Sequence, residues 1–211
     1  MKRPLLAVYL VAAVSCSSSA TAPNPELDIV GWGDSLIEGG GMLGDVSTLL
    51  GRPIHNNGVG GQTSSQILVR VLADSVYRKN VAIFWMGRNN YANPDTVVSD
   101  IAQAVAHLEG RRHFLVLSVL NGEFDGEAKT GANYDTIIAL NARLATAYPS
   151  NFLDVRRTLV AAYNPRSVRD STNAANDIPP ASLRGDELHL NDAGNRIVAI
   201  DVANAIKTKS W

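Results

Sequence analysis

Short apolar runs alternate with amphipathic stretches along the chain from Glu26 onward. Several runs are apolar at consecutive positions, and the segment Val81–Met86 contains no polar residue. A strand without polar alternation is typical of a parallel sheet that is covered on both faces. The pattern predicts five strands, at Leu27–Gly31, Ile54–Asn56, Val81–Met86, Phe114–Val119 and Phe152–Asp154.

The stretches between these runs have helical spacing, and three of them begin with a helix-start signal: Ser64, Asn93-Pro94, and Asn191 or Asp192. No internal repeat and no second linker interrupts the alternation. We therefore expect one domain over residues 26–211, a three-layer α/β/α sandwich with a flavodoxin-like five-stranded parallel sheet. The predicted helices are Gly44–Leu50, Ser64–Arg78, Pro94–Glu109, Tyr134–Ala147 and Asn191–Thr208.

Residues 1–25 have a different character. Lys2 and Arg3 precede an apolar stretch, Leu5–Val14, which has the length of a signal-peptide core and is too short for a permanent membrane span. Cys16 is the only cysteine, and it follows small residues as the lipidated cysteine of a bacterial lipoprotein does. We expect an export signal and a Ser/Pro-rich linker, with membrane anchoring through Cys16 in the bacterial cell envelope, at the outer membrane if the source is Gram-negative. Cleavage without lipid, and hence secretion, is the alternative.

Composition excludes several classes of protein. The 211 residues are 45% hydrophobic and 18% charged, which argues against a disordered chain. Nineteen basic and 20 acidic residues give a net charge of −1, and no basic run occurs, so we expect no nucleic-acid partner. Composition makes no prediction of oligomeric state.

Three glycine-rich loops follow the first three predicted strands. They are Gly31–Leu36, Asn56–Ser64 and Gly87–Asn90. For the strand order 2-1-3-4-5, these loops are neighbours at the carboxyl edge of the sheet, where ligands of such folds bind. Glycine lets backbone N–H groups approach a ligand closely.

At these loops the chain resembles the GDSL, or SGNH, hydrolase family. Four blocks occur in the family's order: Gly33-Asp34-Ser35-Leu36, Gly61, Asn89, and the segment Asp186–His189. Together they span nearly the whole predicted domain, and four blocks in order are far more specific than one tetrapeptide. The third block departs from the family pattern Gly-x-Asn-Asp, because Asn90 replaces the aspartate. The resemblance implies an SGNH hydrolase fold and a serine esterase.

The chemistry of a serine nucleophile points to the same residues. A hydroxyl such as that of Ser35 needs an adjacent base, and the base needs a group that orients it. Among four histidines, only His189 has a carboxylate, Asp186, three residues before it on a polar loop ahead of a helix. We therefore expect Ser35 as nucleophile, His189 as base and Asp186 as orienting acid. The other histidines are expected to be surface or core residues.

A tetrahedral intermediate also needs donors for its oxyanion. The backbone N–H groups of Ser35 and Gly61 and the side-chain amide of Asn89 are the candidates. Asp34 adjoins the serine but points elsewhere on the turn, so we expect it to make a local structural hydrogen bond. The sequence lacks a phosphate loop, a His-Glu-x-x-His motif and paired cysteines, so it implies no cofactor and no metal.

The substrate is less well defined by the sequence. Polar loops at 121–133 and 163–184 and the small number of aromatic residues favour a short acyl group, most simply an O-acetyl group on a carbohydrate. The alternatives are a lipolytic acylhydrolase or thioesterase and, in another class, a noncatalytic glycan-binding lipoprotein on the same fold. Several side chains near the motif loops are candidates for binding a small-molecule or glycan ester, although packing or ion pairing explains them equally well. They are Trp32, Arg88, Asn90, Tyr91, Tyr134 and Arg184.

Overall fold

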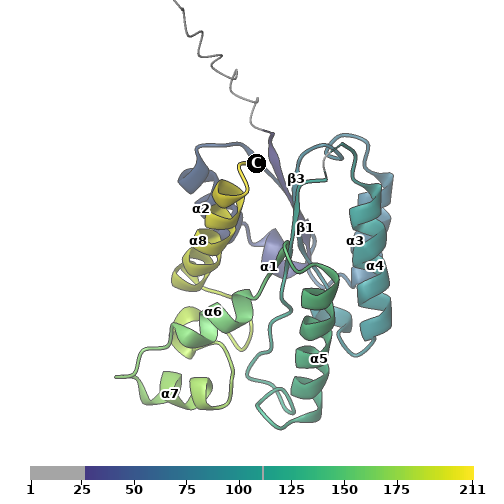
Figure 1. The fold of residues 1–211 in the computed structure, drawn as a ribbon. Helices are drawn as coiled ribbons and strands as arrows, with labels where there is room; N and C mark the ends of the chain where they lie inside the picture. Colours follow the sequence, from purple (N-terminus) through teal and green to yellow (C-terminus); the bar gives the residue numbers. More distant parts are fainter. Residues whose placement is uncertain (1–26, 111) are drawn as a thin grey trace, which may run out of the picture.

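The computed structural model describes residues 27–110 and 112–211 (Figure 1). The expected export signal, the linker and Cys16 lie outside these described residues. Within the two described ranges, no helix is both long enough and apolar enough to cross a membrane.

A five-stranded sheet with all strands parallel forms the middle layer (Figure 1). The strand order is β2-β1-β3-β4-β5, which confirms the predicted α/β class and topology. At the carboxyl edge, Gly33 of β1 lies opposite Gly58 of β2 and Trp85 of β3. The strands are β1 (Ile29–Gly33), β2 (Ile54–Gly58), β3 (Val81–Trp85), β4 (Phe114–Leu117) and β5 (Phe152–Leu153).

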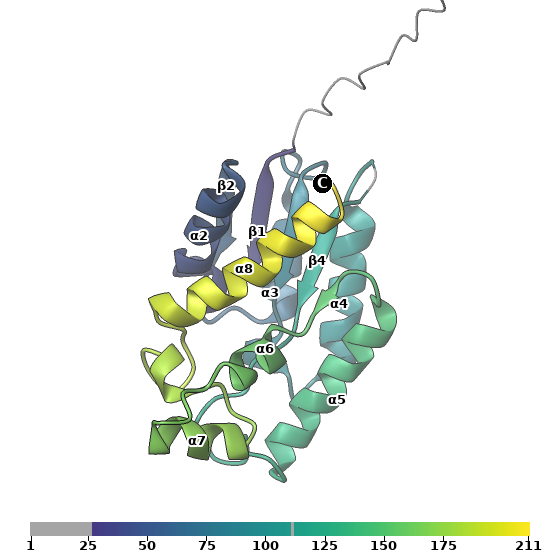
Figure 2. The same cartoon turned by 60° about the vertical axis from the view of Figure 1, so that its left-hand side comes forward.

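Helices cover both faces of the sheet (Figures 1 and 2). α2 and α8 pack together on one face with α6, and α3, α4 and α5 lie on the other. The helices are α1 (Ser35–Glu38), α2 (Gly41–Leu50), α3 (Ser64–Ala73), α4 (Pro94–His107), α5 (Ala132–Ala147), α6 (Val155–Ala161), α7 (Val168–Ala175) and α8 (Asp192–Thr208), with short 3-10 turns η1 (Arg88–Asn90) and η2 (Ala181–Leu183).

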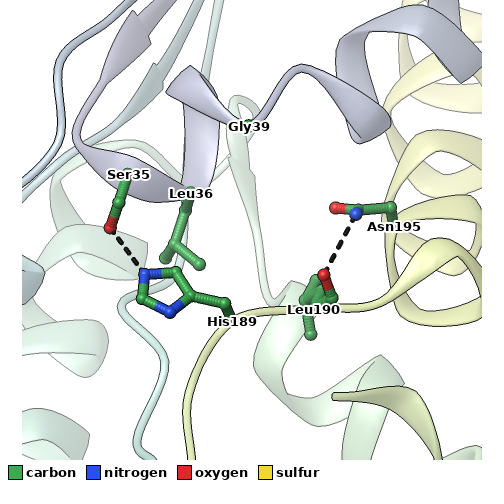
Figure 3. Close-up of a pocket in the computed structure, with 6 residues that line it drawn as sticks. All are labelled: Ser35, Leu36, Gly39, His189, Leu190 and Asn195. Carbon is green, nitrogen blue, oxygen red and sulfur yellow. Dashed lines mark hydrogen bonds between the residues drawn. The ribbon is translucent and has the colours of Figure 1, made fainter. Parts of the chain in front are cut away.

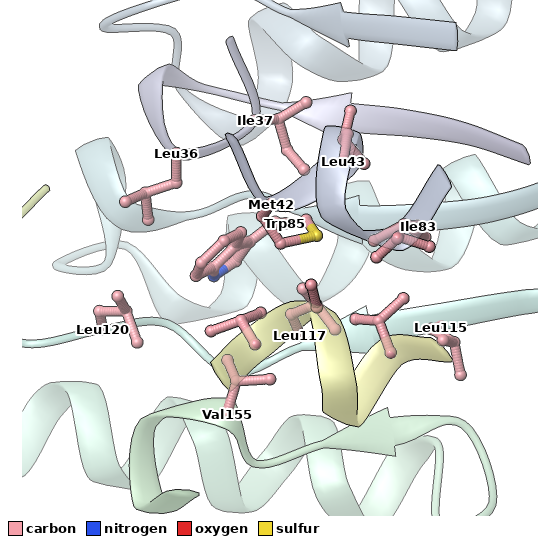
Figure 4. Close-up of a cluster of buried hydrophobic side chains, with 14 of the residues drawn as sticks. Leu36, Ile37, Met42, Leu43, Ile83, Trp85, Leu115, Leu117, Leu120 and Val155 are labelled. Carbon is pink, nitrogen blue, oxygen red and sulfur yellow. The ribbon is translucent and has the colours of Figure 1, made fainter. Parts of the chain in front are cut away.

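The consecutive apolar residues of the strands supply two separate cores. Successive side chains of a strand point to opposite faces. On β3, Ile83 and Trp85 therefore join the core beneath α2 and α8, which Figure 4 shows, and Ala82 and Phe84 join the core beneath α3 and α4. Burial on both faces explains why the strand has no polar alternation.

The sequence misplaced or missed several helical segments. α3 ends at Ala73, five residues before the predicted end, because Asp74 is extended (ψ 134°) and its carboxylate accepts hydrogen bonds from the N–H groups of Val76 and Tyr77. α7 falls inside the predicted loop 163–184. Its buried residues are the polar Asp170 and Asn173, so it carries no apolar stripe.

Gly58 allows the first loop to lie against the sheet. A Cβ atom built at this position would stand 2.1 Å from the backbone nitrogen of Glu38, the last residue of α1. A side chain here would therefore displace α1, which begins at Ser35. Gly58 thus belongs to the framework that positions the expected nucleophile.

Candidate active site

Ser35 is held at the first position of α1, directly beyond the end of β1. Asp34 caps this helix: its Oδ1 accepts a hydrogen bond from the N–H of Leu36 at 3.1 Å, which confirms the local structural role expected for Asp34. The Asp34 side chain is fully buried, and within the described residues its Oδ2 has no hydrogen-bond partner. Burial raises the pKa of Asp34 to about 6, although its bond to Leu36 and the charges of Arg88 and His189 oppose the rise.

Asp186 and His189 lie on one tight turn ahead of α8. Asp186 Oδ1 accepts hydrogen bonds from the N–H groups of Leu188 and His189, both at 2.7 Å. Asp186 Oδ2 lies 2.7 Å from Nδ1 of His189. A single carboxylate therefore shapes the turn and orients the imidazole ring at the same time.

Ser35, His189 and Asp186 form a continuous hydrogen-bonded line. Nε2 of His189 lies 2.8 Å from Oγ of Ser35, as Figure 3 shows. Burial raises the pKa of Asp186, but the hydrogen bonds from Leu188 and His189 outweigh it and hold this pKa at about 2. Asp186 is thus ionised and can only accept, so Nδ1 of His189 carries the proton and Nε2 is free to accept the proton of Ser35.

Arg184 supports this turn from beneath, and the structure corrects its expected role in substrate binding. Its side chain is only 1% exposed, and its guanidinium donates to the carbonyl oxygens of Pro179 and Asp186, both at 2.9 Å. It also pairs with Glu123 at 2.9 Å. The hydrogen bonds from Arg184 and Arg169 lower the pKa of Glu123. Arg184 is therefore a positioning residue for the turn that carries His189.

The three expected oxyanion donors come from neighbouring loops. Gly61 has φ +73°, a conformation that favours glycine, and it is exposed beside the end of β2. Neither the N–H of Gly61 nor that of Ser35 donates to another of the described residues. The exposed Asn89 donates from Nδ2 to the carbonyl oxygen of Gln62 at 2.9 Å, which ties the loop after β3 to the loop that carries Gly61.

Arg70 joins the segments at the carboxyl ends of β1 and β2, a role that no sequence pattern indicated. It donates to the carbonyl oxygens of Gly33 and Asn57 and to Oε1 of Gln62, at 3.2, 2.7 and 2.8 Å. Its guanidinium lies over the ring of Trp32, 5.6 Å from the centroid. Trp32 is 5% exposed, so of the two roles left open for it, packing and substrate binding, the structure favours packing, in which the ring supports Arg70.

Asn90 faces α3 and not the edge of the sheet where Ser35 lies. Its Oδ1 accepts from the N–H of Ser64 at 3.0 Å, and its Nδ2 donates to the Ser64 hydroxyl at 2.8 Å. That hydroxyl in turn donates to Asp100 at 2.5 Å. With both ends of its amide engaged, Asn90 is a structural residue, which corrects its expected role in substrate binding.

Arg88 also has a structural role in place of the expected one. It is 9% exposed and pairs at 2.9 Å with Glu127, which is 3% exposed. The hydroxyl of Tyr91 donates to the same carboxylate at 3.0 Å.

The hydroxyl of Tyr134 donates to Asp177 at 2.6 Å. Burial, and to a smaller extent this hydrogen bond, raises the pKa of Tyr134 to about 12. Tyr91 and Tyr134 are half-buried, and their role in substrate binding stays a prediction.

The remaining histidines lie elsewhere. His55 contacts Asp28 at 3.0 Å, His107 contacts the carbonyl oxygen of Asp74 at 3.1 Å, and His113 stacks on Trp211. Among the residues that the structure describes, no three histidine, cysteine or acidic side chains are grouped as a metal site would require.

Comparisons with known proteins agree with this arrangement at the level of the fold. No protein-family model matches the sequence. The tail spike protein of Salmonella phage epsilon15 is 30% identical over 150 residues, an alignment that covers 65% of this chain and 14% of the tail spike. This chain thus corresponds to a small part of that protein.

Solved structures match a larger share of the chain. A GDSL-like lipase from Bacteroides thetaiotaomicron superposes with a TM-score of 0.65 at 20% identity, covering 86% of this chain and 88% of the lipase. A catalytic mutant of an acetylxylan esterase from Geobacillus stearothermophilus gives 0.65 at 16% identity, with 85% and 94% covered. A G-D-S-L family lipolytic protein from Veillonella parvula gives 0.63 at 15% identity, with 85% and 98% covered. The resemblance seen in the sequence is thereby confirmed for the fold, and the chain has the fold of the GDSL/SGNH hydrolases.

Proposed function

We propose that this protein is a serine esterase that hydrolyses short-chain carboxylic esters, most simply O-acetyl groups on a carbohydrate, through an acyl-enzyme on Ser35. The observation that carries the proposal is the line from Asp186 through His189 to Ser35, with contacts of 2.7 and 2.8 Å. Such a line turns a weak hydroxyl into a nucleophile. The likeness in fold to an acetylxylan esterase and to lipolytic proteins supports the same class of reaction.

In the first half of the reaction, Oγ of Ser35 attacks the ester carbonyl carbon and its proton passes to Nε2 of His189. The carbonyl oxygen becomes an oxyanion, which receives hydrogen bonds from the N–H groups of Ser35 and Gly61 and from the amide of Asn89. The intermediate collapses, the bond to the alcohol oxygen breaks, and His189 returns the proton to that oxygen. The alcohol leaves, and the acyl group stays on Ser35.

In the second half, water attacks the acyl carbon and gives a proton to His189. The bond to Oγ breaks, Ser35 recovers its proton, and the carboxylic acid is released. Asp186 stays ionised throughout and stabilises the imidazolium that forms twice in each cycle.

Hydrolysis of p-nitrophenyl acetate by the wild type and by Ser35→Ala tests the proposal. We expect Ser35→Ala and His189→Ala to lower kcat by about 10⁴ to 10⁶, and Asp186→Asn to lower it less, because the base remains. Ser75→Ala, at an exposed serine, is the matched control and keeps full activity. Phenylmethylsulfonyl fluoride should add mass to the wild type but not to Ser35→Ala.

Two results would reject the proposal. Activity that survives in Ser35→Ala would show that another group attacks the ester. An inactive wild type that still binds acetylated glycans would favour the noncatalytic glycan-binding alternative. Faster turnover of octanoate than of acetate p-nitrophenyl esters would favour a lipolytic acylhydrolase.

A further inference from the structure

Two adjoining hollows extend from Ser35 toward the start of α8. The first has a volume of about 210 Å³, and Figure 3 shows the residues that line it: Ser35, Leu36, Gly39, His189, Leu190 and Asn195. The second, of about 510 Å³, lies between the first turns of α2 and α8 and is lined by glycines together with Asp45, Thr48, Asp192 and Asn195. Asn195 lines both hollows, so the two lie next to each other at this residue.

We infer that these hollows hold the alcohol part of the ester, and that Asn195 accepts a hydrogen bond from a hydroxyl group of a polyhydroxylated alcohol such as a sugar. The inference rests on the proposed esterase function and adds to it a binding site for the leaving group. It makes Asn195 a residue that selects the alcohol and leaves the choice of acyl group to other parts of the site.

The direction of the alcohol follows from the geometry around Ser35. The oxyanion faces Gly61 and Asn89, whose loops meet through Gln62 just ahead of α3. The leaving oxygen must instead come within hydrogen-bonding distance of Nε2 of His189, which returns a proton to it. His189 forms a wall of the first hollow, on the side of α1 and α8. The alcohol therefore extends into that hollow.

The amide of Asn195 is oriented to accept. Nδ2 donates to the carbonyl oxygen of Leu190 at 3.2 Å, and this fixes the orientation of the amide because an oxygen in that place would face another oxygen. Figure 3 shows the oxygen of Asn195 on the side of the hollow, toward Gly39. No donor among the described residues reaches this oxygen. An amide oxygen so placed suits a hydroxyl donor.

The second hollow has the same chemical character. Its lining includes Asp45, Asp192 and Thr48, and Oδ1 of Asp45 also pairs with Arg196 at 3.0 Å. A Cβ atom built at Gly44 would meet nothing within 4 Å, so this part of the α2 surface is open. Arg196 neutralises Asp45, so Asp192 supplies the negative charge of this lining. Hydroxyl groups donate well to a carboxylate, whereas the phosphate of a lipid headgroup would be repelled by it. The lining therefore favours a neutral polyol over a phospholipid.

The test compares two acetate esters with different alcohols. Monoacetylated methyl xyloside carries free hydroxyl groups, and p-nitrophenyl acetate carries none. We expect Asn195→Ala to lower kcat/KM for the sugar ester about tenfold, which is the effect of losing one hydrogen bond. The same variant should change kcat/KM for p-nitrophenyl acetate less than twofold. Asn204→Ala, at an exposed position on α8, should change neither.

A second variant distinguishes two roles of Asn195: accepting a hydrogen bond from the substrate and donating one to the carbonyl oxygen of Leu190. Asn195→Asp keeps an acceptor oxygen but loses the donor to Leu190, so it should retain most of the activity on the sugar ester. Equal losses on both esters would overturn the inference, since they would show a purely structural role. Unchanged turnover of the sugar ester, or a shift from acetate toward butanoate nitrophenyl esters, would also overturn it. A wild type inactive on both esters would reject the proposed function itself.

Discussion

The side-chain amide of Asn89 donates to the carbonyl oxygen of Gln62 at 2.9 Å, and this bond joins the loops that follow β3 and β2. An amide nitrogen carries two hydrogens. One is engaged by Gln62, and the other is available to an oxyanion beside Ser35. Because Gln62 follows Gly61 directly, the same bond fixes the distance between two of the three proposed donors.

We expect Asn89→Ala to lower kcat for p-nitrophenyl acetate by about 10² to 10³ with little change in KM. The reason is that the lost donor acts on the charge of the transition state and much less on the neutral ester. Steady-state kinetics measure the split, and thermal unfolding of the same samples checks that the fold survives. An unchanged kcat in a stable variant would show that Asn89 is not an oxyanion donor and that its role is limited to the hydrogen bond to Gln62.

The chain from Asn90 through Ser64 to Asp100 gives a prediction about stability. Asn90 donates to the Ser64 hydroxyl, whose own hydrogen goes to Asp100. In Asn90→Asp, two carboxylates would compete for one hydrogen, and we expect a loss of about 1 to 3 kcal/mol in the free energy of unfolding. Adding Asp100→Asn reverses the direction of the chain and should restore most of the loss.

Urea unfolding of the wild type, the two single variants and the double variant measures this coupling. Strictly additive effects would contradict it, since residues in one hydrogen-bond network are expected to be non-additive.

Asp34 predicts a pH dependence of stability. Its pKa is about 6 in the folded protein and 3.8 in a free side chain, so the folded state holds the proton more tightly than the unfolded state does. The free energy of unfolding should therefore fall as pH rises from about 4 to 6, by on the order of 3 kcal/mol, and no further above that range. Asp34→Asn should cap α1 without this fall. If the free energy of unfolding depends on pH in the same way in the wild type and in Asp34→Asn, the raised pKa does not belong to Asp34.

The prediction for the first 25 residues concerns processing. If Lys2, Arg3 and Leu5–Val14 direct export and Cys16 is lipidated, protein from the membranes of its native host should begin at Cys16 and carry added lipid. Intact-mass analysis measures both properties. A lipid-free chain that begins near Ala22 or Glu26 would indicate secretion, and an unprocessed chain in the cytosol would reject export.

The α/β class and the burial of the sheet on both faces could be predicted because the apolar runs are continuous and alternate with amphipathic stretches. The short α1 could not, because four residues carry no periodicity and their conformation depends on Asp34 and on contact with Gly58. α7 was missed for another reason. Its buried Asp170 is satisfied by Ser182, twelve residues away, and such a long-range polar contact leaves no local signal.

The same distinction holds for the site. Asp186 and His189 are three residues apart, so their pairing was visible in the sequence. Arg70 and Arg184 were not recognised as supports of the loops, because each donates to two backbone carbonyl oxygens, which every residue has, in addition to its side-chain partners. Trp32 and Arg88 seemed available to a ligand, since the sequence does not show that Arg70 covers the one and Glu127 neutralises the other.

Ser35 and His189 are 154 positions apart in the sequence, and this separation has a consequence during synthesis of the protein. A ribosome makes β1 and α1 well before the turn that bears Asp186 and His189, and α8 follows that turn. A nascent chain that has not reached this turn holds Ser35 without its proposed base, so we expect it to be inactive on esters. Under the proposed function, ester hydrolysis can begin only when this turn has been made and α8 has docked on α2, so the appearance of activity would report that α2 and α8 have packed together.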